Sequence, residues 1–278
     1  MHLYQAFNLT LAADLKIIEF LPTTTPIGEI QAKIYQSSIP ENTSSTSQQF
    51  LLDIRPIARF LIKDGNQIIY DNHLNLDLDS LRLFLLGSAI GALLQQRGYI
   101  VLHGNAVSVD GKSCTVFVGE QGSGKSTMAA WHYQQGSYIL ADDVCAITFI
   151  EDEPYVIPSY PHLKLWQNSA DLLGISTETL RRVRPQDEKY SLPIHSQFYS
   201  KSLPLKEIKI INPKATTETL ISGTAKLQQL IQHSYRFNFL SAMDLNNPYI
   251  KQLMKLANQV TLKETMRIKL NTLILADS

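Results

Sequence analysis

The chain has 278 residues, of which 44% are hydrophobic and 18% charged, a balance typical of a globular protein with enough apolar material for a core. It carries 25 Lys and Arg residues against 25 Asp and Glu residues, and this zero net charge argues against a broad electrostatic surface for nucleic acid. Asp14, Lys16 and Glu19 interrupt any apolar signal region and the apolar stretch 81–94 is short for a bilayer span, so we expect a cytoplasmic protein without a membrane partner.

The N-terminal part of the chain predicts strands followed by one long helix. Residues 1–40 alternate apolar and polar positions in places, which predicts two or three strands of an antiparallel sheet. The apolar runs 60–62 and 68–70 flank Asp64 and Gly65, and this pair supplies the positive φ that a tight hairpin needs. Residues 77–97 predict a largely buried helix that ends at Gly98. We therefore expect a β-rich region over residues 1–75 and a second domain over residues 76–278.

From residue 99 onward the pattern changes to short strands that alternate with turns and helices. The predicted strands cover 99–102, 106–109, 115–118, 138–141, 144–150 and 205–211, and residues 163–166 are expected to be ordered. The predicted helices cover 126–135, 169–173, 217–234 and 248–259, with a helical turn at 176–182. Residues 184–194 are polar and predict a loop, and residues 260–275 favour no single structure.

A phosphate-binding loop follows the strand predicted at 115–118. The segment fits the pattern G-x-x-x-x-G-K-(S/T), with a strand before it and a helix after it. Glycines let successive N–H groups point at phosphate oxygens, and the helix N-terminus adds partial positive charge. Lys125 would reach the β- and γ-phosphates, and the Ser126 hydroxyl would bind Mg²⁺. The predicted nucleotide-binding residues are Gly119, Glu120, Gln121, Gly122, Ser123, Gly124, Lys125, Ser126 and Thr127.

Two adjacent carboxylates follow the strand predicted at 138–141. A nucleotide-binding sheet places the acid that holds Mg²⁺ at such a position, so Asp142 is the candidate metal ligand beside Ser126. The neighbouring Asp143 is the candidate general base for an attacking hydroxyl. A structural turn is the alternative reading of the pair, because Asp suits turns and caps.

Three further residues are candidates for contact with phosphate. His103 lies between two predicted strands that lead to the phosphate-binding loop, although histidine is also common in turns. Arg184 and Lys189 lie on the polar segment, where a cation could stabilise a transferring phosphoryl group. A solvated run of charges would explain these two residues equally well.

Three segments in this order resemble the catalytic domain of bacterial HPr kinase/phosphorylase. They are Leu102-His103-Gly104, the phosphate-binding loop, and the stretch from Gln135 to Val144 that contains both aspartates. The resemblance implies an α/β (α+β) P-loop kinase core similar to phosphoenolpyruvate carboxykinase, with an N-terminal strand-rich extension. It also implies that Lys125 and Ser126 hold ATP and Mg²⁺, that the aspartates serve metal and base, and that His103 lies in the active site.

The sequence also departs from that family. The bifunctional enzymes carry a signature E-(I/V)-R-G-(L/M)-G beyond the aspartates, linked to their phosphorylase activity, and this chain does not contain it. Residues 161–166 and 184–190 instead resemble divergent HPr-kinase-related proteins, some of which are encoded with peptide-modification systems and phosphorylate a serine of a precursor peptide. The resemblance therefore implies a peptide substrate and phosphate contacts by Arg184 and Lys189.

These observations predict an ATP-dependent kinase that phosphorylates a serine-type hydroxyl of a peptide or protein. One alternative is a small-molecule kinase, acting for example on a free amino acid. Another is a non-catalytic nucleotide-binding module, which would be expected to have lost at least one of Lys125, Ser126, Asp142 and Asp143. The sequence leaves open whether the chain forms a homo-oligomer.

Overall fold

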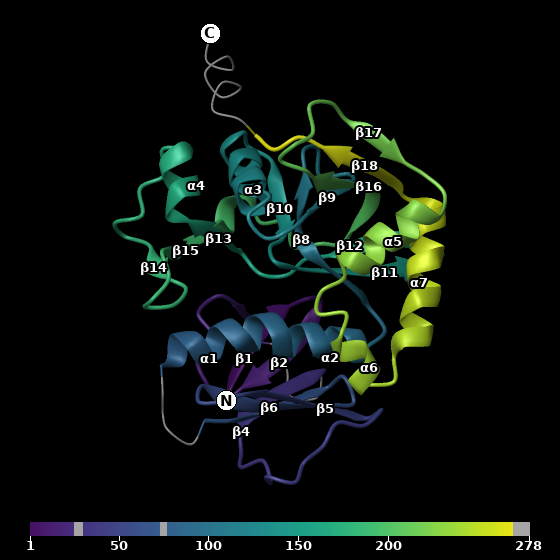
Figure 1. The fold of residues 1–278 in the computed structure, drawn as a ribbon. Helices are drawn as coiled ribbons and strands as arrows, with labels where there is room; N and C mark the ends of the chain where they lie inside the picture. The colour runs from purple at the N-terminus through teal and green to yellow at the C-terminus, as the bar shows by residue number, and fades with distance from the viewer. Residues whose placement is uncertain (25–29, 73–76, 269–278) are drawn as a thin grey trace.

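The computed structural model describes residues 1–24, 30–72 and 77–268, which form several sheets and a small number of helices. In Figure 1 a first sheet lies below a long helical stretch, and a larger sheet with its own helices lies above it. This arrangement is the mixed α/β (α+β) class that the sequence predicts. The boundary predicted between residues 75 and 76 lies outside the described residues, and the division into two domains stays a prediction.

The first sheet has seven strands in the order β3-β1-β2-β4-β7-β6-β5. The predicted hairpin is confirmed: β6 and β7 pair antiparallel, and Asp64 and Gly65 between them have φ of 51° and 62°. The strands are β1 (His2–Ala6), β2 (Leu9–Ala13), β3 (Leu21–Pro22), β4 (Ala32–Gln36), β5 (Gln49–Ile54), β6 (Ala58–Lys63) and β7 (Gln67–Asp71).

The prediction that residues 1–40 form an antiparallel sheet is wrong for one of its strands. β1 pairs antiparallel with β2 and β3, but β4 pairs parallel with both β2 and β7. The chain between β2, which ends at Ala13, and β4, which begins at Ala32, is long enough to cross over, and such a crossover permits parallel pairing. Alternating hydrophobicity identifies the strands but carries no information about their direction.

One helical stretch, Leu78–Gln96, separates the two larger sheets. It comprises α1 (Leu78–Phe84), a π-helical turn (Leu85–Ala89) and α2 (Ile90–Gln96), which agrees with the predicted helix. Its length and mean hydropathy of 1.3 would suit a membrane span as well as a core helix, and 78% of this apolar window is buried inside the protein. Apolar side chains of both sheets and of this stretch form one core, including Phe60, Leu85 and Val101.

The second sheet has eight strands, seven of them in the order β10-β8-β11-β12-β16-β18-β17, with β9 between β8 and β16. The strands predicted at 99–102 and 106–109 are one continuous strand, because the chain stays extended through Gly104. A Cβ at Gly104 would lie 2.5 Å from the Phe117 carbonyl oxygen, so glycine permits this close pairing. The strands are β8 (Ile100–Ser108), β9 (Cys114–Val118), β10 (Tyr138–Ala141), β11 (Val144–Ile150), β12 (Glu153–Ile157), β16 (Leu203–Ile211), β17 (Thr219–Ile221) and β18 (Thr261–Thr265).

A third, smaller sheet has the order β13-β15-β14. Two predictions are wrong here. The helical turn predicted at 176–182 is not formed, since its last two residues belong to a strand, and the loop predicted at 184–194 contains a strand. Pairing with the apolar strand β13 orders this polar segment, which is a tertiary effect. The strands are β13 (His162–Trp166), β14 (Arg181–Arg182) and β15 (Lys189–Pro193).

The remaining helices cover the second sheet. The helix predicted at 217–234 is wrong in its first part: Gly223 has a φ of 61° and separates strand β17 from α5. Residues 260–268 contain β18, and residues 269–275 of the ambiguous segment lie outside the described residues. The helices are α3 (Lys125–Gln134), α4 (Gln167–Leu172), α5 (Thr224–Gln232), α6 (Phe239–Ala242) and α7 (Asn246–Gln259), with a 3-10 turn at His195–Gln197.

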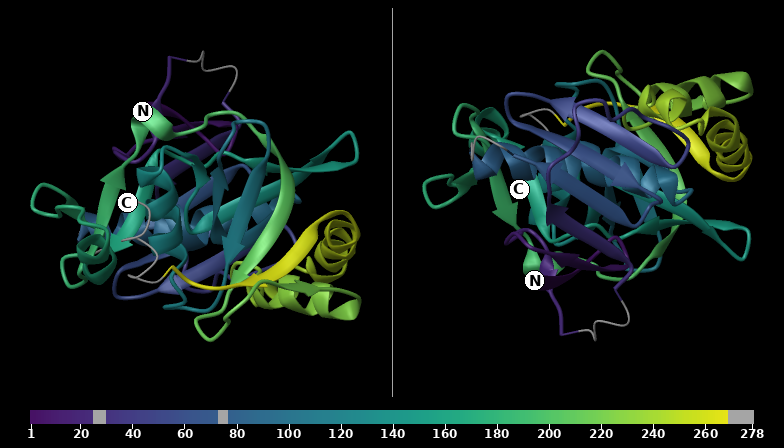
Figure 2. Two further views of the ribbon diagram at one scale, coloured as in Figure 1. Left: turned by 90° about the horizontal axis from the view of Figure 1, so that it is seen from above. Right: turned by 90° about the horizontal axis from the view of Figure 1, so that it is seen from below.

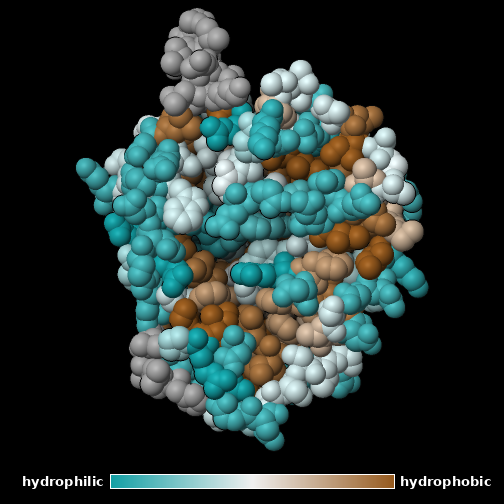
Figure 3. Space-filling model, viewed as in Figure 1, coloured by the Kyte–Doolittle hydropathy of each residue, from teal (hydrophilic) through white to brown (hydrophobic). Residues whose placement is uncertain are grey.

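Both views in Figure 2 place α5 and α7 along one edge of the molecule, away from the third sheet. A groove of about 740 Å³ lies between β17, α5 and α7, and the exposed side chains of Leu220 and Met254 line it. Figure 3 shows apolar surface on the side where these helices lie. The phosphate-binding loop lies elsewhere, at the N-terminus of α3.

Candidate active site

The phosphate-binding loop has the strand–loop–helix context that its motif predicts. Strand β9 ends at Val118, and α3 begins at Lys125. Between them Gly119, Gly122 and Gly124 have φ of 155°, 79° and 105°. A Cβ at Gly119 would lie 2.6 Å from the Ser123 Oγ and 2.9 Å from the Ile211 carbonyl oxygen, so the loop closes only around glycine.

The side chains of the loop contain polar groups suited to phosphate. Lys125 Nζ donates to the carbonyl oxygens of Gly119 (2.7 Å) and Glu120 (3.0 Å), and burial lowers the pKa of Lys125. The Ser123 Oγ is buried and has no hydrogen-bond partner among the described residues. Thr127 Oγ1 lies 2.7 Å from Ser169 Oγ on α4. The unsatisfied hydroxyl is a group that a phosphate oxygen would satisfy.

Asp142 lies beneath the active-site surface. Its side chain is 3% exposed, and its carboxylate accepts hydrogen bonds from the Asn105 amide and from the Lys164 backbone N–H at 2.6 Å. Burial, together with the neighbouring Asp143, raises the pKa of Asp142. These two bonds tie the turn after β10 to strands β8 and β13.

The Asp143 carboxylate is held between the imidazole of His103 and the ammonium of Lys164. His103 Nε2 lies 3.0 Å from Oδ1, and Lys164 Nζ lies 2.9 Å from Oδ2. Burial by itself would raise the pKa of Asp143, but Lys164 and His103 hold it well below its usual value. Asp143 also raises the pKa of the buried Lys164, against the effect of burial on that ammonium. Asp143 is therefore ionised at neutral pH.

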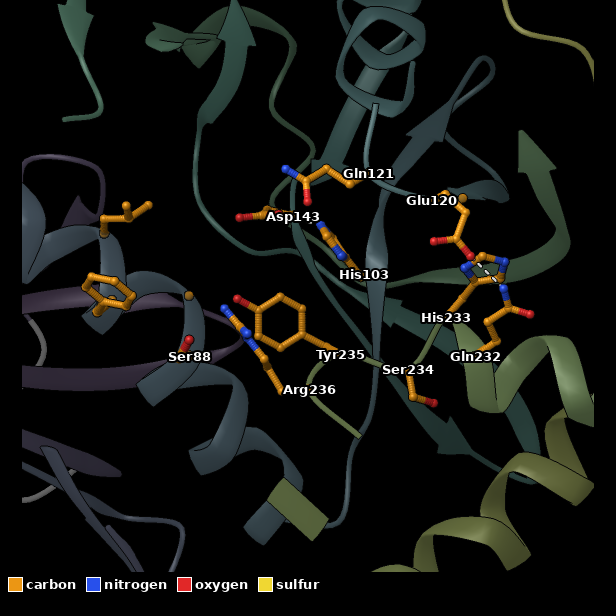
Figure 4. A pocket seen from close by; sticks show the side chains of 14 residues that line it. Ser88, His103, Glu120, Gln121, Asp143, Gln232, His233, Ser234, Tyr235 and Arg236 are labelled. Atoms are coloured by element: carbon orange, nitrogen blue, oxygen red, sulfur yellow. Dashed lines mark hydrogen bonds and ion pairs between the residues drawn. The ribbon is translucent and has the colours of Figure 1, made fainter. Parts of the chain in front are cut away.

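A cavity of about 440 Å³ brings several predicted site residues together. Glu120 and Gln121 of the loop line one side of the cavity, and His103 and Asp143 lie near its middle (Figure 4). The helical stretch Leu78–Gln96 and the chain after α5 form the remaining wall, so the cavity lies where the two large sheets meet.

Several predicted site residues lie outside the cavity lining, namely residues 122–127 of the loop, Asp142, Arg184 and Lys189. Arg184 Nε lies 4.0 Å from Asp187 Oδ2 on the turn between β14 and β15. Lys189 Nζ lies 5.5 Å from the centre of the Trp166 ring. Neither Arg184 nor Lys189 is among the described residues that line the cavity. The charge of Lys189 still contributes to lowering the pKa of Asp143, so Lys189 lies within electrostatic range of the site.

Several residues of the site were not predicted as site residues from the sequence, and four of them carry polar groups of interest. Lys164 is a lysine within the apolar strand β13, and a buried charge on such a strand was its one signal. Ser88, Tyr235 and Arg236 line the cavity but belong to segments without a recognisable motif. Only the fold places these three next to the phosphate-binding loop.

The chain after α5 is fixed against β8. His103 N–H donates to the His233 carbonyl oxygen at 2.9 Å, and Tyr235 N–H donates to the Val101 carbonyl oxygen at 2.7 Å. The Tyr235 side chain packs on the helical stretch, where a Cβ at Gly87 or Gly91 would lie 2.9 Å from its atoms. The two glycines thus make room for Tyr235.

No protein-family model matches the chain, and no curated protein matches it by sequence. Among solved structures, the chain is similar to the Hpr(Ser) kinase/phosphatase from Coxiella burnetii with a TM-score of 0.34. The two share 9% sequence identity, and the match covers 64% of this chain and 91% of that chain. A similarity of this size is too low to establish a shared fold, so the functional argument rests on the geometry of the site.

Proposed function

We propose that this chain is an ATP-dependent kinase that transfers the γ-phosphoryl group to a serine-type hydroxyl of a peptide or protein. One observation carries this proposal: a carboxylate held in its ionised form, Asp143, lines the same cavity as the phosphate-binding loop. Phosphoryl transfer requires positioning, neutralisation of charge and a base for the acceptor proton, and this pair of features would supply them.

Two side chains of the loop, Lys125 and Ser123, would hydrogen-bond to the phosphates of ATP. Lys125 would exchange its two loop carbonyls for phosphate oxygens, and Ser123 Oγ would gain a partner. Mg²⁺ at such sites is bound by one or two protein ligands together with substrate phosphates. Ser126 is the proposed ligand at the start of α3. Asp142 remains the second proposed ligand, because each of its oxygens accepts one hydrogen bond and retains a lone pair.

Asp143 is the proposed base. The acceptor oxygen forms a bond to the γ-phosphorus while the bond from that phosphorus to the ADP oxygen breaks, and the hydroxyl proton passes to the Asp143 carboxylate. Because the transition state of such transfers is loose, the hydroxyl needs little deprotonation early in the reaction, and an aspartate of low pKa is sufficient. His103 and Lys164 hold the carboxylate in place.

A small-molecule kinase and a nucleotide-binding module are the alternatives. A binding module has no need of an ionised carboxylate beside the phosphate-binding loop, and the contacts of Asp143 favour an enzyme. The choice between a peptide and a small molecule depends on the wall of the cavity away from the loop.

The test is transfer of label from γ-labelled ATP in the presence of Mg²⁺. We expect a library of serine-containing peptides to accept the label and a matched library with alanine in place of serine to remain unlabelled. The Asp143→Asn variant serves as the control for non-enzymatic transfer. Binding of ATP without transfer to any peptide or small hydroxyl compound would contradict the proposal and favour the binding module.

A further inference from the structure

The cavity wall formed by the chain after α5 carries one permanent positive charge, on Arg236. Among the described residues that line the cavity, Arg236 is the one arginine or lysine. Its side chain is exposed, and the described residues contain no ion pair with it. A guanidinium at a cavity surface that is not held in an ion pair is available to a ligand.

The position of Arg236 is fixed by its neighbours. Tyr235 is anchored to Val101 on one side, and the Arg236 carbonyl oxygen accepts a hydrogen bond from Phe239 N–H at 2.8 Å on the other. Arg236 has a φ of 47°, in the left-handed region that arginine rarely adopts. Such a conformation persists only where the surrounding structure determines it, and it is common at ligand sites.

Arg236 lies beyond the reacting centre when viewed from the phosphate-binding loop. Figure 4 shows Glu120 and Gln121 on one side, Asp143 and His103 between, and Ser88, Tyr235 and Arg236 on the other side. In a phosphoryl transfer the attacking and leaving oxygens lie roughly in line on opposite sides of phosphorus. With ATP on the loop, Arg236 therefore belongs to the side from which the acceptor enters.

We propose that the phosphoryl acceptor carries a carboxylate a few bonds from its reacting hydroxyl, and that Arg236 binds this carboxylate. The inference rests on the proposed function and names the acceptor class for the same site. A guanidinium binds a carboxylate through two parallel hydrogen bonds. One cation matches a single negative charge, whereas a phosphate group with two charges would be expected to meet more than one cation. Ser88, on the π-helical turn, offers a further hydroxyl on this wall.

Such a carboxylate has two sources, a free hydroxy acid or an acidic group next to serine in a peptide. Binding is measured by ligand-observed NMR with a non-hydrolysable ATP analogue and Mg²⁺ present. One arm compares L-serine with L-serinamide, and the other compares N-acetyl-Ser-Asp-amide with N-acetyl-Ser-Asn-amide. The acid should bind about 10- to 100-fold more tightly than its amide in at least one arm, as expected for a charge-assisted pair. The arm that shows this preference identifies the source.

Variants of Arg236 test whether this arginine causes the preference for the acid over the amide. Arg236→Gln should abolish the preference for the acid, and Arg236→Lys should keep part of it. Lys251→Gln removes one positive charge from the exposed face of α7 and should keep all of it. Equal binding of acid and amide in both arms would overturn the inference, as would a preference that survives in Arg236→Gln.

Two further outcomes separate this inference from the proposed function. If Arg236→Gln weakens the ATP analogue instead of the acid, the arginine contacts the nucleotide and the inference is wrong. If no hydroxyl compound accepts label from ATP, the proposed function fails, while the preference for the acid is still measured by binding alone.

Discussion

Asp142 and Asp143 are neighbours in sequence but their carboxylates have opposite surroundings. Asp143 contacts the Lys164 ammonium and the His103 imidazole at the cavity, and its pKa is lowered. We expect Asp143→Asn to reduce turnover by about 10²- to 10⁴-fold, the usual contribution of a general base, while nucleotide affinity stays nearly unchanged. Steady-state kinetics and calorimetry with ATP measure the two quantities. Wild-type turnover in this variant would remove Asp143 from the mechanism.

Asp142→Asn should lower stability as well as the apparent Mg²⁺ affinity, since Asp142 is a proposed metal ligand. The new amide would turn its NH₂ group toward either the Asn105 amide or the Lys164 N–H, and one buried donor would lose its acceptor. A buried donor without a partner costs about 1–3 kcal/mol, so the unfolding midpoint in denaturant should fall. Asp187→Asn on the surface turn is the control. An Asp142→Asn variant with lowered stability but unchanged Mg²⁺ dependence would remove Asp142 from the proposed metal site.

Lys125 is the side chain of the loop that can neutralise phosphate charge. In Lys125→Ala the loss of its charge-assisted hydrogen bonds should weaken ATP binding about 10- to 100-fold. The variant should fold normally, because the side-chain hydrogen bonds of Lys125 go only to two carbonyls of the loop itself. Calorimetry with ATP and Mg²⁺ gives the affinity. Equal affinity in wild type and variant would contradict the phosphate-binding role of the loop.

At the scale of elements, α2 packs closely against the Tyr235 ring at Gly91. Alanine usually stabilises a helix by about 0.5–1 kcal/mol relative to glycine. A Cβ at Gly91 would nevertheless lie 2.9 Å and 3.0 Å from two ring carbons of Tyr235, so Gly91→Ala should lower the thermal midpoint. In a Tyr235→Leu background the same change should become neutral or stabilising. Destabilisation of equal size in both backgrounds would exclude the ring contact as the cause.

Helices, strands and turns were predictable from the sequence where neighbouring residues determine their conformation. The glycine pattern and flanking apolar run predicted β9, the phosphate-binding loop and α3, and Asp64 with Gly65 predicted the β6–β7 hairpin. Local patterns failed where a distant partner decides. Strand β15 is polar and forms because β13 lies beside it, and β8 stays extended through Gly104 because β9 approaches closely there.

At the scale of the whole molecule, buried neutral histidines make stability depend on pH. Burial lowers the pKa of His132, His162 and His233 to about 4 each. Their unfolded pKa is about 6.5, so between these values the unfolded chain binds more protons than the folded chain. The stabilisation is complete above about pH 6.5 and is lost as the pH falls toward 4. The raised pKa of Asp142 acts in the opposite direction, since protonation favours its buried form.

Thermal unfolding between pH 7.5 and pH 4.5 tests this expectation. The midpoint should fall across this range, and His132→Gln should fall less steeply than the wild type. His2→Gln, on the exposed end of β1, should follow the wild-type curve. A wild-type midpoint that does not change with pH would show that these histidines keep access to protons in the folded state.

The candidate site was only partly predictable for the same reason as the fold. Motif residues such as Lys125 and Asp143 can be identified from the residues next to them in the sequence. Ser88 and Arg236 line the cavity and Lys164 contacts Asp143 beside it; the three lie on separate elements, and no spacing in the sequence links them. Their assignment required the packing of both large sheets against the helical stretch.

Because of that helical stretch, Leu78–Gln96, the first sheet cannot be exchanged independently of the cavity. It belongs to the core of the first sheet and at the same time supplies Ser88 to the cavity. A chimaera joined before the stretch would expose its apolar side toward the first sheet, and one joined after it would lose one wall of the cavity. Exchange of the first sheet alone should therefore both disturb the core and reshape the cavity that Asp143 lines.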